Sequence, residues 1–197
     1  MHTPLTTTRC LSICLGVVLA LLTACNCTNV TQTTWVEHQG GVVVDSHQQR
    51  ADAAVKRLMA CRQPAQRVGV QVLNSETISA CVWPNRRIYI TRGLMDRLTD
   101  DELAAALSHE IGHLLDDGNL RSMVALRGLG PIRGAAAGAD HEVQADTLGC
   151  GLLESAGIPQ AAMITMLEKV RAAHADDPYL REGLDQRLVR LHATLNQ

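Results

Sequence analysis

The chain has 197 residues, a formal net charge of −2 and 19% charged residues. It contains 2 Trp, 2 Tyr and no Phe, and its basic residues form no cluster. These features exclude a nucleic-acid-binding surface, which needs concentrated positive charge and stacking side chains. The apolar residues are mainly Leu, Val, Ile, Ala and Met, so the core is expected to consist largely of packed helices in one domain.

The first 24 residues are predicted to be a targeting sequence. Arg9 precedes an apolar run over residues 11–22, which is too short to span a bilayer. The run ends in Leu-Thr-Ala before Cys25, a pattern that resembles a bacterial lipobox. It predicts a lipoprotein signal peptide over residues 1–24, with lipid attached to Cys25. Asn26 after this cysteine resembles lipoproteins of the outer membrane, so we expect the chain at its periplasmic face. An uncleaved membrane anchor is the alternative, and it leaves the rest of the chain on the same side.

Local patterns predict the organisation of the remaining chain. Residues 25–44 are expected to be the lipidated N-terminus and a tether, and residues 45–197 the folded domain. Predicted helices cover residues 45–61, 99–118, 140–157, 161–173 and 181–195, and predicted strands cover residues 68–73, 80–82 and 87–91. A turn at residues 83–86 joins the last two strands, which predicts a small antiparallel sheet. An edge of this sheet could pair with an extended peptide, or the sheet could be purely structural.

The cysteines after Cys25 suit an oxidising compartment. Four remain, at positions 27, 61, 81 and 150, and four cysteines allow three pairings. A disulfide between Cys61 and Cys81 is the preferred prediction, and two separately buried thiols are the alternative. No Cys-x-x-Cys pair occurs, so a cysteine zinc site is not expected.

The sequence His109-Glu110-Ile111-Gly112-His113 carries the strongest functional signal. It lies inside a predicted helix that begins with a capping box, Thr99 to Glu102. Residues four apart share a helix face, so both imidazoles can bind one ion while Glu110 holds a water beside it. This is the minimal equipment of a zinc hydrolase.

A catalytic zinc needs a third protein ligand. One known continuation, with Gly and His after the motif, is excluded because those positions are Asp116 and Asn119. Glu142 and Asp146 share a face of the next predicted helix, and small residues at 145, 149 and 151 would let this helix approach the first one closely. Glu142 could equally be a solvated carboxylate at a helix start. Between the helices, the Gly-rich residues 128–138 could be a lid or a connector.

Glu142-x-x-Ala145-Asp146, downstream of the first motif, resembles the second signature of the HtpX and CAAX prenyl protease family of zinc metallopeptidases. Residues 88–94, 101–104, 146–149 and 156–157 extend the resemblance, which covers about residues 68–195. It implies an α+β, mainly helical, zincin-like domain of the gluzincin type, with a small antiparallel sheet beside the zinc helix and one Zn²⁺ per chain. It further implies that His109, His113 and Glu142 bind zinc, that Glu110 is the general base, and that Asp146 orients a ligand histidine.

The chain departs from this family before its last helix. Family members often carry His-Pro there, followed by an Arg, whereas this chain has Asp177-Pro178, with His174 earlier and Arg187 later. His174 could replace the family histidine, and Arg187 is a candidate for stabilising the transition state.

Together these patterns predict a lipid-anchored periplasmic zinc metalloendopeptidase. The resemblance suggests unfolded envelope proteins as polypeptide substrates. A non-hydrolytic, zinc-containing envelope chaperone or assembly lipoprotein is the alternative. A zinc hydrolase that acts on a non-peptide amide is a third interpretation.

Overall fold

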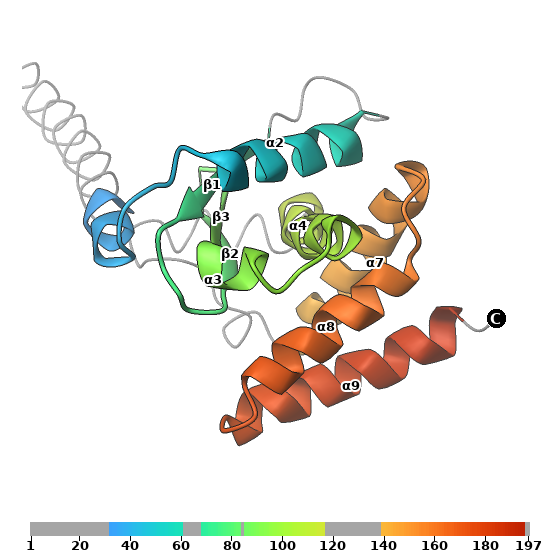
Figure 1. Cartoon of the computed structure of the whole chain (residues 1–197). Coiled ribbons are helices and arrows are strands. Elements are labelled where there is room, and N and C mark those ends of the chain that lie inside the picture. The colour runs from blue at the N-terminus through green and yellow to red at the C-terminus, as the bar shows by residue number, and fades with distance from the viewer. Residues whose placement is uncertain (1–31, 61–67, 84, 117–138, 196–197) are drawn as a thin grey trace, which may run out of the picture.

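The computed structural model describes residues 32–60, 68–83, 85–116 and 139–195. Within these ranges the fold is mainly helical, with one small sheet (Figure 1). The elements in chain order are α2 (Ser46–Met59), β1 (Gly69–Leu73), β2 (Ala80–Trp83), β3 (Arg87–Thr91), α3 (Arg92–Met95), α4 (Asp100–Leu115), α7 (Ala139–Ser155), α8 (Ala161–Ala173) and α9 (Pro178–Leu195).

The sheet is mixed, so the prediction of an antiparallel sheet is wrong in part. Strand order is β1-β3-β2, with β2 antiparallel to β3 as the predicted turn requires. β1 pairs in parallel with the other side of β3, with Val70 opposite Ile88. Alternation of apolar residues identifies each strand but does not encode strand order, because order depends on where the connection between β1 and β2 takes the chain.

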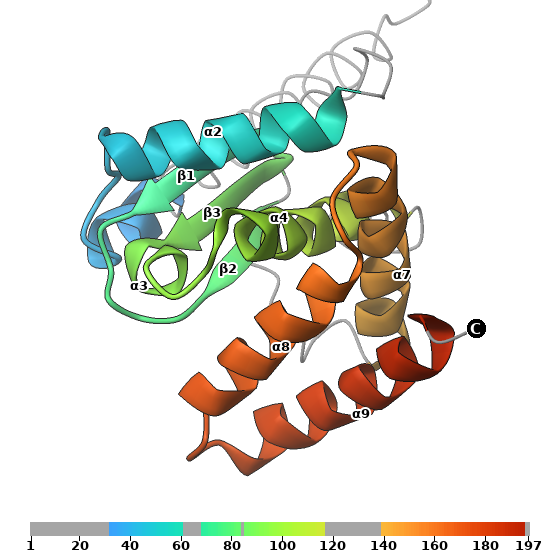
Figure 2. The same ribbon diagram turned by 45° about the vertical axis from the view of Figure 1, so that its right-hand side comes forward.

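Helix α4 runs through the middle of the fold. Its predicted capping box is confirmed: Thr99 and Glu102 each accept a hydrogen bond from the other's backbone N–H. Every residue from Glu102 to Leu114 is buried. Figure 2 shows α2 and the sheet on one side of α4, and α7 and α8 on the other.

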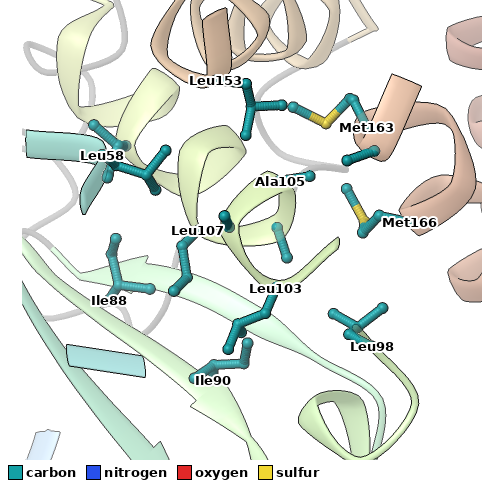
Figure 3. Close-up of a cluster of buried hydrophobic side chains, with 14 of the residues drawn as sticks. Leu58, Ile88, Ile90, Leu98, Leu103, Ala105, Leu107, Leu153, Met163 and Met166 are labelled. Carbon is teal, nitrogen blue, oxygen red and sulfur yellow. The ribbon is translucent and has the colours of Figure 1, made fainter. Parts of the chain in front are cut away.

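The core forms around this central helix. Figure 3 shows Ile88 and Ile90 of β3 on one side of α4, and Leu153 and Met163 of α7 and α8 across it. Leu107 of α4 is completely buried within this cluster. Full burial of one such side chain contributes about 1.5–3 kcal/mol, so α4 is fixed by packing along its length. The residues it carries are therefore held in a rigid frame.

Residues 32–44 are part of the folded structure, which corrects the expectation of a tether up to residue 44. Residues 32–38 are helical, and the Trp35 ring centroid lies 5.4 Å from those of Trp83 and Tyr89. The Val43 N–H donates to the Val72 carbonyl at 2.9 Å. This segment covers the sheet face that α2 and α4 leave open.

Several predicted boundaries are close to the observed ones. α8 has the predicted bounds, whereas α9 begins earlier because the Asp177 carboxylate accepts hydrogen bonds from the N–H groups of Tyr179 and Leu180. Cys81 and Cys150 are buried. Cys27, Cys61 and residues 128–138 lie outside the described ranges, so the disulfide remains a prediction and the choice between a lid and a connector for residues 128–138 stays open. None of the helices in those ranges is long and apolar enough to cross a membrane.

Candidate metal centre

Three side chains from α4 and α7 converge at one point. The Nε2 atoms of His109 and His113, one helical turn apart, face each other at 3.1 Å. The Glu142 carboxylate approaches both, with Oε2 3.3 Å from His109 Nε2 and Oε1 3.4 Å from His113 Nε2. The two histidines are buried and Glu142 is nearly so. Two separate helices thus bring together a compact set of atoms that could hold a metal ion.

These distances fit a single zinc ion. Tetrahedral zinc with bonds of about 2.0–2.1 Å to nitrogen holds neighbouring ligand atoms about 3.3 Å apart. Glu142 Oε1 is buried and makes no hydrogen bond to the described residues. Burying such an oxygen against facing imidazole nitrogens is costly unless a cation lies among them. The donor set of two imidazoles and one carboxylate is typical of catalytic zinc.

Small residues allow α7 to bring Glu142 this close to α4. A Cβ atom at Gly149 would lie 3.2 Å from the backbone nitrogen of His109, so this predicted close-contact residue does lie in the helix crossing. Gly151 was predicted to lie there too, but a Cβ atom there would have no neighbour within 4 Å. Gly112, inside the motif, was missed although it makes a tight contact with Ala145.

Asp146 contacts the side of the His109 ring that faces away from His113. Its Oδ1 atom is 2.9 Å from His109 Nδ1, the ring nitrogen that points away from His113. A histidine that binds a metal through Nε2 carries its proton on Nδ1, so Nδ1–H donates to Asp146 in that state. This bond fixes the tautomer and the orientation of the ring.

Arg187 of α9 connects the carboxylates of α7. Its guanidinium donates to Asp146 through Nε at 2.8 Å and Nη2 at 2.6 Å, and to Glu142 through Nη1 at 3.0 Å. Nη2 also lies 3.1 Å from His109 Nδ1, but a protonated Nδ1 cannot accept a hydrogen bond. Arg187 was a candidate for stabilising the transition state, and it does line the cleft. The structure places its guanidinium against Glu142 and Asp146, contacts that no local sequence pattern signals.

The charges of this cluster shift the pKa values of its members. Burial raises the pKa of Glu142 and Asp146, but hydrogen bonds with His109 and, for Asp146, with Arg187 outweigh it, so both pKa values lie below their usual range. Burial and Arg187 lower the pKa of His109, yet its bonds to the two carboxylates raise that pKa to about 9. The carboxylates therefore favour a positive charge at this point.

A cleft of about 760 Å³ is lined by Glu110 and by the three candidate ligand residues, His109, His113 and Glu142. Burial raises the pKa of the Glu110 carboxyl, and the charges of His109 and His113 act against this shift. The cleft extends from the helical segment 32–38, past the start of β2, to α9, where its lining reaches from Tyr179 to Arg190. A raised pKa beside a cleft is typical of a group that accepts and returns a proton.

The Asp177-Pro178 pair, which stands where family members often carry His-Pro, has a local structural role. Asp177 caps α9 and also lines the cleft. His174, the candidate replacement, lies in the cleft wall, where its Nε2 atom is 3.2 Å from the Ile78 carbonyl oxygen. In the part of the chain that the structure describes, His174 is not among the residues that could hold a metal ion.

Comparison with known proteins identifies relatives of this chain. The family model for peptidase family M48 matches residues 45–139, a range that includes the His109–His113 motif and ends before Glu142. Metalloprotease LoiP of Escherichia coli (strain K12) is 28% identical over 131 residues, which cover 53% of this chain and 52% of that protein. The chain thus spans about half the length of this relative. These matches confirm the family resemblance predicted from the sequence.

Proposed function

Because residues 45–139 match the model of peptidase family M48 and the chain is similar to a metalloprotease, we propose that it is a zinc metalloendopeptidase of this family. The observation that carries this proposal is the convergence of His109, His113 and Glu142 beside Glu110 in an open cleft. His109, His113 and Glu142 would hold one zinc ion. Asp146 would orient His109, and Glu110 would be the general base.

Zinc held by these residues would polarise a carbonyl group and lower the pKa of a water molecule. Glu110 would take the proton from the water that attacks the peptide carbonyl, and would give it to the leaving amine. The raised pKa of Glu110 suits both steps, because the carboxyl must take up a proton and release it near neutral pH. Asp146 and Arg187 keep His109 in place while this happens.

The sheet supports a polypeptide as the substrate. β2 is the last strand in the order β1-β3-β2, so its outer edge is not paired with another strand of this sheet. Ala80 and Cys81 of β2 line the same cleft as Glu110. Pairing of an extended peptide with an open sheet edge is a common mode of peptide recognition. A peptide bound in this way to β2 would run past the candidate metal centre.

The location of the protein is part of the proposal. The lipobox-like sequence before Cys25 supports cleavage after residue 24 and lipid attachment, with the peptidase domain on the periplasmic side of the outer membrane. Unfolded envelope proteins are the substrate class we propose. Cys25→Ser should abolish lipid labelling and release the protein from the membrane fraction. Membrane retention of this variant without a lipid would contradict the anchor.

The substitution Glu110→Gln tests the activity. The variant should bind one zinc ion per chain, yet hydrolyse unfolded casein at least about 100-fold more slowly, because general-base catalysis contributes about 10²–10⁴-fold. Glu168→Gln on α8 is the matched control, and it should hydrolyse casein like the wild type. Equal hydrolysis by the Glu110→Gln and wild-type proteins would refute the mechanism. Zinc binding without any hydrolysis by the wild type would favour the chaperone alternative.

A further inference from the structure

The N-terminal segment forms one wall of the cleft. Trp35 and Gln39 line it together with Leu73 and Tyr89 of the sheet. Figure 1 shows the helical residues 32–38 in blue beside the sheet, on the side away from α7. The segment precedes residues 45–139, the range that the M48 family model matches. This wall is therefore a feature of the present chain that the family match does not describe.

Specific contacts hold the wall in place. Besides the ring contacts of Trp35, the Gln32 side-chain amide donates to the Tyr89 hydroxyl at 2.6 Å, and Asn85 donates to Gln32 at 3.1 Å. Gly40 adopts a positive φ of 84°, and a Cβ atom there would lie 2.2 Å from the Asn74 carbonyl oxygen. Only glycine allows this turn to lie against Asn74. The wall is thus anchored on both sides of Trp35.

The aromatic residues of the chain gather at this cleft. Of the 2 Trp and 2 Tyr, Trp35, Tyr89 and Tyr179 line the cleft, and Trp83 packs against Trp35. Tyr179 is 87% exposed at the start of α9. Tyr89 is only 3% exposed and packs with Leu73 and Trp83 in a buried cluster, so the aromatic surface open to the cleft belongs to half-buried Trp35 and exposed Tyr179. Aromatic rings that face a cleft are typical of recognition sites, because they contribute much of the contact energy there.

We propose that Trp35 is a specificity-determining residue. Its half-buried ring, supported from behind by Tyr89 and Trp83, forms the apolar wall of a subsite that accepts a large aliphatic or aromatic side chain of a polypeptide lying along β2. The inference rests on the proposed function, because the subsite shares its cleft with Glu110 and the metal-ligand residues. Trp35 acts through binding and takes no part in the chemical step.

Two sets of peptides test the subsite. In each set one residue, Leu or Ser, is placed in turn at every position of an otherwise constant sequence. Dissociation constants are measured with Glu110→Gln protein, and kcat/KM with active protein. Trp35→Ala should reduce the preference for Leu over Ser at one position roughly tenfold, the scale on which an apolar pocket discriminates. Glu37→Ala is the control, because Glu37 is exposed in the same segment and does not line the cleft.

The preference for Leu over Ser is a ratio of two measurements on the same protein, so it separates an effect on recognition from an effect on stability. Partial unfolding raises both dissociation constants of a Leu and Ser pair by the same factor, and lowers both kcat/KM values by the same factor, so it leaves their ratio unchanged. Trp35→Leu keeps an apolar side chain against Trp83 and should give an intermediate ratio. The same ratio in the wild-type and Trp35→Ala proteins would overturn the inference, as would the absence of peptide binding to Glu110→Gln protein. Peptide binding with the expected ratios, but no Glu110-dependent hydrolysis, would refute the proposed function and leave the subsite supported.

Discussion

Gly112 of α4 and Ala145 of α7 meet where the two helices cross: a Cβ atom at Gly112 would lie 2.4 Å from the Ala145 carbonyl oxygen. The glycine precedes His113, and the alanine follows Glu142 by three residues. The spacing of the two helices at this crossing therefore sets the distance between Glu142 and the two imidazoles. Helix packing and metal-site geometry depend on the same contact.

Substitution of Gly112 should disturb both properties. Gly112→Ala forces the helices apart, because backbone atoms cannot yield as a flexible side chain would, and overpacking of this kind typically costs about 1–3 kcal/mol. Gly151→Ala, in the middle of α7 with open space around it, should be neutral or stabilising by about 0.4–1 kcal/mol. Chemical denaturation of zinc-free protein measures both values, and calorimetric titration measures zinc affinity. Equal stability of the two variants would contradict the tight crossing.

Asp146→Asn tests the support of His109. The amide keeps the size of the side chain but removes the charge that favours the required tautomer, so zinc affinity should fall about 10–100-fold. Asp140→Asn, exposed near the start of the same helix, should bind zinc like the wild type. Competition with a chromophoric chelator gives both dissociation constants. Unchanged affinity in Asp146→Asn protein would rule out an orienting role for Asp146.

Arg187→Met tests the connection between α9 and α7. Without the guanidinium, the carboxylates of Glu142 and Asp146 lose a buried partner, which should lower the free energy of unfolding of zinc-free protein by about 3–5 kcal/mol. Arg181→Met, at an exposed position earlier on α9, should change it by at most about 0.5 kcal/mol.

Zinc should partly restore the stability of the Arg187→Met protein. The ion supplies positive charge to Glu142, so zinc should raise the melting temperature of this variant more than that of the wild type. Urea denaturation without zinc and thermal denaturation with zinc provide the two measurements. A zinc-free variant as stable as the wild type would exclude a stabilising role for the Arg187 contacts.

His47 should make stability depend on pH. Its ring lies 3.0 Å from Asp96 and 3.1 Å from Asp45, and hydrogen bonds with these carboxylates raise its pKa. A pKa that is higher in the folded state stabilises the protein fully below the unfolded value of about 6.5, and this contribution is lost as pH rises through the folded value. The melting temperature of wild type minus that of His47→Gln should therefore be larger at pH 5.5 than at pH 9. A difference that stays constant with pH would contradict this contribution.

Residues whose partners are close in sequence were predicted well. The Thr99–Glu102 capping box, the hairpin between β2 and β3, and the shared face of His109 and His113 all depend on spacings of a few residues. Such spacings determine local geometry directly, because a helix or a tight turn fixes which side chains meet.

Features that depend on distant partners could not be predicted in the same way. Arg187 meets Asp146 across 41 positions, and β1 pairs with β3 only because of the path between β1 and β2. Gly112 was given no role from the sequence, although its missing side chain makes the helix crossing possible. Trp35 was assigned to a tether because its neighbours are Thr and Gln, and local composition hides a single anchoring ring.

If Cys25 carries a lipid as proposed, the docking of residues 32–44 would limit how far the folded domain can move from the membrane. A tether up to residue 44 would let the domain move roughly 65 Å from Cys25, at about 3.3–3.6 Å per residue. With Gln32 bonded to Tyr89, the seven steps of chain from Cys25 to Gln32 reach at most about 25 Å. A lipid at Cys25 would thus confine the cleft to a thin layer above the bilayer. Under the proposed function and location, polypeptides that emerge at the membrane surface would meet the cleft before those in the bulk periplasm do.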